Sequence, residues 1–265
     1  DVVSGNGGSE DSGDYLILMQ KIEGLNLQQL KFGTSSAVPL ALSFYVRSNL
    51  TGTFQFVADA PDSGSYRYFS KTYTIDSANT WEKKTINIPA NTNSTAIPDD
   101  NTEGLRVQWQ LVGGSSYTSG SYSDGTWQGT GANTMSSSAN NTFARSTDNE
   151  FLITGVQLEV GQNPTTFEHE PFGVTLKKCH RYFFKNTSTH IPSNILRPDN
   201  IRNFDIGFDT MRATPTATVT YSDDGTGSSL NLQAVFADRY RGNTQATSTS
   251  SADPRLTAFE VDAEL

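Results

Sequence analysis

The residues best suited to binding a ligand lie in one polar tract, residues 113–149. Gly, Ser, Thr and Asn dominate it, and so long an internal loop in a compact domain is either functional or disordered. Sugars present apolar C–H faces that stack on aromatic rings, and small polar groups bond to their hydroxyls. The sequence therefore nominates a set of glycan-binding candidates: Tyr117, Tyr122 and Trp127 with Asp124 and Gln128 as polar partners, then Tyr66 and Tyr68. The alternative for each ring is packing within its own domain.

Other side chains that carry chemistry are sparse. Because Cys179 is the only cysteine, neither an intrachain disulfide nor a cysteine-based zinc site can form. The three histidines lack metal-ligand spacing, and neither a Gly-x-Ser-x-Gly elbow nor a Gly-rich phosphate loop occurs. We therefore expect no catalytic residue, metal or cofactor. A glycosidase needs only two carboxylates, so that alternative stays open among Glu82, Glu103, Asp124, Asp148 and Glu150.

Three acidic clusters raise the question of a structural calcium ion. They are Asp59–Gly64, Asp99–Glu103 and Asp223–Gly225. Calcium requires several hard oxygen ligands, which these clusters could supply, but the same residue types are favoured in turns. None has the spacing of an EF-hand loop. We favour the turn interpretation, which predicts that dialysis against a chelator leaves the melting temperature unchanged.

Charge and hydropathy narrow the classes of partner. The 265 residues include 28 acids and 19 bases, a net charge of -9. Affinity for nucleic acid or for an anionic membrane surface comes largely from Lys and Arg, so neither partner is expected. The longest apolar run, Tyr15–Met19, is far shorter than the roughly 20 residues that cross a bilayer, and no membrane insertion is predicted.

Hydrophobic periodicity indicates a mainly β protein. Ser, Thr and Asn make up 80 of the 265 residues, a composition typical of sheets joined by turns. Apolar residues alternate with polar ones in segments 40–46, 54–58, 86–88, 105–111, 204–208, 230–236 and 259–265, as in strands with one buried face. The last strand is expected to run to Leu265. Helical spacing occurs only in segments 22–30 and 176–184.

The chain divides into two parts by charge. Residues 1–170 hold all of the net charge of -9, whereas residues 171–265 are neutral overall. Pro164, Pro171 and Gly173 lie at the transition, which places a domain boundary near residues 165–175. The second part has about 90 residues, near the small end for an independent core, and symmetric copies would enlarge that core.

Three stretches, taken together, resemble the distal part of bacteriophage tail-fibre and receptor-binding proteins. The first comprises Gln20–Gly24, Leu42–Ser48, Tyr73–Ile75 and Asn79–Ile86; the second Ile153–Gly161, Phe167–Gly173 and Cys179–Tyr182; the third Met211–Pro215 and Phe259–Leu265. The second stretch is the most specific. The resemblance covers nearly the whole chain, and its order matches the charge boundary.

The resemblance implies an all-β chain in four parts. These are a flexible segment 1–14, a jelly-roll, carbohydrate-binding-module-like sandwich 15–168, a linker with a short helix 169–186, and a smaller β-sandwich 187–265 that forms a homotrimer. It further implies a non-catalytic appendage of the phage particle that contacts other virion proteins and recognises a bacterial surface glycan during adsorption. No sugar-contacting position transfers from the family. The alternatives are a capsid or tail decoration protein and a polysaccharide depolymerase.

Overall fold

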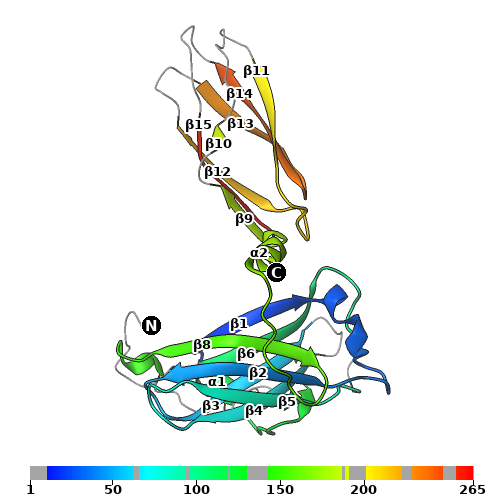
Figure 1. The fold of residues 1–265 in the computed structure, drawn as a ribbon, viewed down its shortest axis with the longest axis vertical. Coiled ribbons are helices and arrows are strands. Elements are labelled where there is room, and N and C mark those ends of the chain that lie inside the picture. The colour runs from blue at the N-terminus through cyan, green and yellow to red at the C-terminus, as the bar shows by residue number, and fades with distance from the viewer. Residues whose placement is uncertain are drawn as a thin grey trace. The chain divides into compact units, whose positions relative to one another are not determined.

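A computed structural model describes residues 11–61, 66–93, 96–118, 120–129, 143–186, 189–190, 201–222, 228–246 and 255–264. The chain is all-β, as predicted, and divides into two compact units, Asp1–Glu168 and His169–Leu265 (Figure 1). Strands account for most of the described elements in both units. None of the described helices is long and apolar enough to span a membrane.

The first unit is a jelly-roll sandwich of two antiparallel sheets. One sheet has the order β1 (Tyr15–Glu23), β6 (Glu103–Gly113), β3 (Gly52–Ala60), β4 (Arg67–Ile75) and β7 (Trp127–Gly129). The other has the order β5 (Glu82–Ile88), β2 (Leu40–Ser48) and β8 (Phe151–Val160). The short helices η1 (Gly24–Asn26), η2 (Gln28–Leu30), α1 (Ser115–Thr118) and η3 (Phe143–Arg145) lie in the connections.

The core of this unit lies between the two sheets and is aromatic. Phe44 of β2 meets Trp109 of β6 edge to face, with ring centroids 5.5 Å apart, and Phe56 of β3 meets the same indole at 5.7 Å. All three side chains are buried. Because side chains alternate between the two faces of a strand, the alternation in β2, β3 and β6 sends these rings inward. The predicted strands 40–46, 54–58, 86–88 and 105–111 are confirmed.

The second unit contains the helix α2 (Phe172–His180) and two further antiparallel sheets. One pairs β10 (Thr189–His190), β9 (Phe183–Asn186) and β12 (Thr216–Ser222) with β15 (Arg255–Asp262). The other has the order β11 (Ile201–Gly207), β14 (Arg239–Ala246) and β13 (Ser228–Val235). Its buried core consists of Met211, Tyr240, Phe259, Val261 and Ala263.

The structure differs from the sequence predictions at three boundaries in this unit. The helix expected at 176–184 spans Phe172–His180, because residues 183–186 pair with β15 as strand β9. That strand lies within residues 169–186, which were predicted as a linker. The last strand ends at Asp262, and the Arg212 guanidinium then donates hydrogen bonds to the carbonyls of Ala263 and Glu264. Leu265 and residues 1–10 of the predicted flexible segment lie outside the described residues.

Candidate functional site

The face of the five-stranded sheet that points away from the core buries a group of polar side chains around Val57. Its members are Gln55 and Asp59 of β3, Tyr68 and Ser70 of β4, and Gln108 and Gln110 of β6, which we call the polar face. They share one face because Gln55 pairs with Gln110, and Asp59 with Tyr68, in the strand register. None is more than 8% exposed. Burying so many polar groups requires hydrogen-bond partners for each of them.

The segment before β7 lies along one edge of the polar face. The backbone N–H of Gly125 donates to the carbonyl of Ser70 at 2.7 Å, which holds this segment beside β4. The Tyr122 hydroxyl accepts a hydrogen bond from the Gln55 amide at 3.1 Å and donates one to the Asp124 carboxylate at 2.6 Å. Two of the nominated loop residues are thereby brought together at the sheet edge.

Asp124 is the centre of a charged cluster that reaches solvent, which we call the Asp124 cluster: Lys71, Thr72, Tyr122 and Asp124. The backbone N–H and the hydroxyl of Thr72 donate to Asp124 Oδ1 at 2.7 and 3.1 Å, and the Lys71 ammonium contacts Oδ2. Desolvation opposes ionisation, but the hydrogen bonds from Lys71, Tyr122 and Thr72 outweigh it and lower the pKa of Asp124 to about 2. Asp124 is therefore a carboxylate at neutral pH.

Hydrogen-bonding capacity is left over in this cluster. A carboxylate has about four acceptor positions and an ammonium group three donors. Among the described residues, Asp124 Oδ1 accepts from three groups, whereas Oδ2 contacts one, the Lys71 ammonium. In the part of the chain that the structure describes, the one polar partner of the Lys71 ammonium is Asp124, and both side chains are more than a third exposed. Oδ2 of Asp124 and the Lys71 ammonium thus keep hydrogen-bonding capacity at a partly exposed position, next to the half-buried Tyr122.

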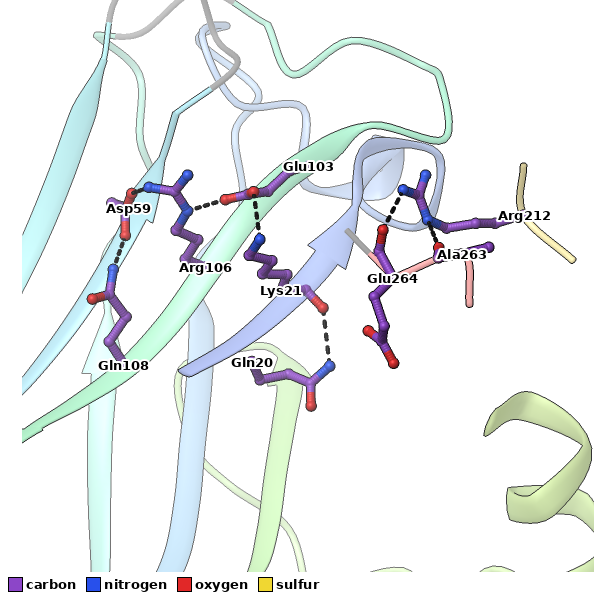
Figure 2. A network of polar contacts seen from close by, with 9 residues as sticks. All are labelled: Gln20, Lys21, Asp59, Glu103, Arg106, Gln108, Arg212, Ala263 and Glu264. Carbon is purple, nitrogen blue, oxygen red and sulfur yellow. Dashed lines mark hydrogen bonds and ion pairs between the residues drawn. The ribbon is translucent and has the colours of Figure 1, made fainter. Parts of the chain in front are cut away.

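A second network occupies the same sheet face near the other end of β3, as Figure 2 shows. The fully buried Asp59 accepts hydrogen bonds from Tyr66 at 2.8 Å, from Arg106 at 3.4 Å and from Gln108. Desolvation raises the pKa of Asp59 despite these partners. Burial and the adjacent Asp59 also raise the pKa of Tyr66, so its hydroxyl stays a donor.

This network continues outward to charged groups at the sheet edge. Arg106 also contacts Glu103, which lies 3.5 Å from the ammonium of Lys21 on β1 (Figure 2). Arg106 is therefore shared between a buried and a partly exposed carboxylate. The nominated Tyr66 belongs to this network and not to the Asp124 cluster. Its phenol fixes the buried carboxylate beneath the surface.

The remaining nominated residues take different positions. Tyr68 is 1% exposed, and its hydroxyl lies 3.5 Å from Gln128 Oε1, while the Gln128 amide donates to the carbonyl of Ser123 at 2.8 Å. Gln128 therefore ties β7 to the Asp124 segment. Tyr117 lies in α1, where its ring meets that of Tyr15 edge to face at 5.4 Å, outside both clusters.

Trp127 packs on the core side of the sheet. Its ring centroid lies 5.5 Å from that of Phe32 and 5.9 Å from that of Phe69, and its indole N–H donates to the carbonyl of Pro89 at 2.6 Å. Trp127 pairs with Phe69 in the register of β4 and β7, so both point toward the core. Its indole face is thus used in packing, the alternative that we gave for every ring.

Among the carboxylates that could serve a glycosidase, Glu82, Glu103 and Asp124 each pair with a cationic side chain. Glu82 accepts from the backbone N–H groups of Asp76 and Ser77 and pairs with Lys84 at 2.6 Å; these contacts, Lys84 foremost, lower its pKa to about 2. The pKa of Asp124 is also about 2. A general acid in glycoside hydrolysis needs a raised pKa, which neither group has.

Of the acidic clusters considered for calcium, Asp99–Glu103 forms a bend that leads into β6, as the turn interpretation predicts, whereas Asp59 of the first cluster is a buried residue of strand β3. Asp100 accepts hydrogen bonds from the hydroxyl of Thr102 and from its backbone N–H, the latter at 2.9 Å. These bonds, that of the hydroxyl foremost, lower the pKa of Asp100. Within the described ranges, no group of three or more His, Cys, Asp or Glu side chains is placed to hold a metal ion. Residues 62–65 and 223–227, parts of the other two clusters, lie outside those ranges.

No protein-family model matches this chain, and no curated protein matches it. The site therefore rests on its own geometry. Sequence reasoning missed Gln55, Lys71, Thr72, Arg106 and Gln108. A signal for three of them was present, because Gln55, Arg106 and Gln108 occupy the polar positions that alternate with the core residues of β3 and β6.

Proposed function

We propose that the first unit binds a bacterial surface glycan at the Asp124 cluster, within a non-catalytic appendage of a phage particle. The observation that carries the binding proposal is the unused hydrogen-bonding capacity of Asp124 and Lys71 beside the Tyr122 ring. Charged hydrogen bonds to hydroxyls and an aromatic face are the two elements of sugar recognition. The virion role and adsorption to the host follow from the resemblance to tail-fibre proteins.

The buried polar face supports this site from beneath. Gln55 holds the Tyr122 hydroxyl, and Gln128 holds the carbonyl of Ser123, so both flanks of Asp124 are fixed before a ligand arrives. Such preorganisation reduces the entropy lost on binding. A decoration protein that contacts only other virion proteins has no need for a partly exposed, hydrogen-bonded charged cluster of this kind.

The test is binding of the fluorescently labelled protein to candidate host cells, with and without periodate oxidation of their surface glycans. We expect binding that periodate abolishes and that Lys71→Met weakens by about tenfold, the equivalent of one charged hydrogen bond. The matched control is Lys83→Met, an exposed lysine of β5 in the other sheet. Periodate-resistant binding, or equal binding of both variants, would exclude the site. Release of reducing ends from host polysaccharide would favour a depolymerase instead.

We also propose that the appendage is a homotrimer. The supporting observation is α2, which has no buried residue and exposes Phe172 at 78% along with Val174 and Leu176. A nine-residue helix is marginal in water unless its apolar residues pack against another surface, which two further copies would provide. Light scattering should give a mass of about 86 kDa, three times the 28.8 kDa chain. A stable monomer would contradict the trimer.

A further inference from the structure

A pocket separate from the polar face lies where η1 and η2 meet the segment 96–98. Its volume is 410 Å³, within the range of about 300–1,000 Å³ typical of small-molecule sites. It is lined by Leu27, Gln28, Lys31, Phe32, Thr34, Ser36, Ala96 and Ile97. Neither the candidate residues from the sequence nor the Asp124 cluster contributes to it.

The pocket is rigid and has an apolar floor. Leu27, Phe32 and Ile97 are at most 6% exposed and belong to the hydrophobic core of the first unit. The Gln28 amide donates to the carbonyls of Gly24, Ile97 and Pro98 at 2.8, 3.2 and 3.1 Å, which ties η2 to the opposite wall. The cavity is therefore preformed, and closure around a ligand costs little entropy.

The rim carries one positive charge that the protein does not neutralise. Lys31 lines the pocket and is exposed, and its ammonium makes no ion pair or hydrogen bond within the described part of the chain. By contrast, Lys21, Lys71 and Lys84 each contact a carboxylate. An unpaired cation at the mouth of a pocket, in a unit of strong net negative charge, selects for an anionic ligand by charge complementarity.

The backbone around Lys31 is fixed by its turn geometry and by local hydrogen bonds. Lys31 adopts the left-handed conformation with φ of 50°, which ends η2 and turns the chain toward the rim. The Thr34 hydroxyl then donates to the carbonyl of Lys31 at 2.8 Å and accepts from the backbone N–H of Ser36 at 3.2 Å. The hydroxyl of Ser36 has no hydrogen bond within the described residues, so it faces the pocket as a further polar group.

We propose that this pocket binds an acidic monosaccharide unit, such as a uronic acid. The C–H face of the pyranose ring would lie on the floor formed by Phe32 and Ile97. Its carboxylate would contact the Lys31 ammonium, and a ring hydroxyl the Ser36 hydroxyl. A phosphate would leave the apolar floor unused, since phosphate sites rely on backbone N–H groups or several Arg and Lys side chains. This inference deepens the proposed function by naming a sugar class and a second subsite.

The test uses methyl β-glucuronide and methyl β-glucoside as probes, titrated into the full chain and followed by NMR. We expect the glucuronide to bind at least about tenfold tighter than the glucoside, and Lys31→Gln to remove that preference, because one charged hydrogen bond is lost. Ala96→Trp should fill the cavity and abolish binding of both sugars. Lys83→Gln, an exposed lysine of the other sheet, is the matched control.

Several results would overturn the inference. These are equal affinities for the two glycosides, a preference that survives Lys31→Gln, or binding to the Ala96→Trp variant with an unchanged melting temperature. The outcome separates from that of the proposed function, because the probe is a free glycoside and not a cell. Glucuronide binding together with periodate-resistant cell binding would sustain the pocket and exclude the adsorption role. Absence of glucuronide binding together with periodate-sensitive cell binding would exclude the pocket and leave the adsorption role standing.

Discussion

Replacing Asp59 tests whether the buried carboxylate of the polar face stabilises the fold by its charge or by its shape. Asp59→Asn keeps one acceptor oxygen for Tyr66, and the Gln108 amide can rotate to accept from the new amide. Arg106 retains Glu103. Because desolvation raises the pKa of Asp59 above its ordinary 3.8, burial penalises the charged form relative to the unfolded chain, and the uncharged amide avoids that penalty. We expect Asp59→Asn to cost about 1 kcal/mol or less at pH 7.

Asp59→Ala is the contrasting variant. It leaves the Tyr66 hydroxyl and the Gln108 amide without an acceptor and removes one partner of Arg106, which should cost about 3–5 kcal/mol. Urea denaturation followed by tryptophan fluorescence is the assay, because Trp81, Trp109 and Trp127 all lie in the first unit. If Asp59→Asn costs as much as Asp59→Ala, the charge itself stabilises the fold and our reasoning fails.

The sign of the pH dependence gives a second check. A carboxyl whose folded pKa is raised binds more protons in the folded state than in the unfolded one. Its contribution to stability is therefore largest below the unfolded value of about 3.8 and is lost as pH rises through the folded pKa. Stability of the wild type relative to Asp59→Asn should thus increase on acidification from pH 7. A decrease would mean that the partners outweigh desolvation.

Two further predictions concern single residues of the first unit. Glu82→Gln should lower the free energy of unfolding by about 1–2 kcal/mol at pH 7, measured by urea denaturation and allowing for partial solvent screening. Because the folded protein lowers the pKa of Glu82 from 4.5 to about 2, this cost should disappear as the pH falls from 4.5 to about 2. A cost that stays constant at all pH values would contradict this prediction. Trp127→Ala should cost about 3–4 kcal/mol and lower the melting temperature, because the indole packs on Phe32 and Phe69. If that variant is as stable as the wild type, the indole does not pack as described.

The strands of the first unit could be predicted because their alternation is strong. Phe54, Phe56 and Ala58 occupy every second position of β3, and this alternation places all three apolar side chains on the face that packs in the core. The residues between them in the same strand, Gln55 and Asp59, lie on the opposite face, and the sequence alone does not show whether that face is exposed or buried. Burial there depends on what covers the sheet, which local patterns do not encode.

The orientation of the loop aromatics could not be predicted for a related reason. Trp127 and Gln128 are neighbours, and in a strand one of them must face the core and the other the polar face. Pairing of Trp127 with Phe69 decides between the two, yet β7 has only three residues and no periodic signal of its own. The end of α2 was missed likewise, because residues 183–186 pair with β15 as strand β9, and this long-range pairing leaves no local signal.

The ligand-binding role that we propose would give the polar face a reason that stability alone does not. An apolar layer would bury the same area without a desolvation cost, whereas Asp59, fully buried, has a raised pKa that records such a cost. Natural proteins depart from the cheapest packing mainly at functional sites. The Asp59→Asn variant tests both the stability of the fold and the binding to host cells. If it is stable but binds host cells less well, the buried network positions the binding surface; if it is stable and binds unchanged, the network is only a structural layer beneath the Asp124 cluster.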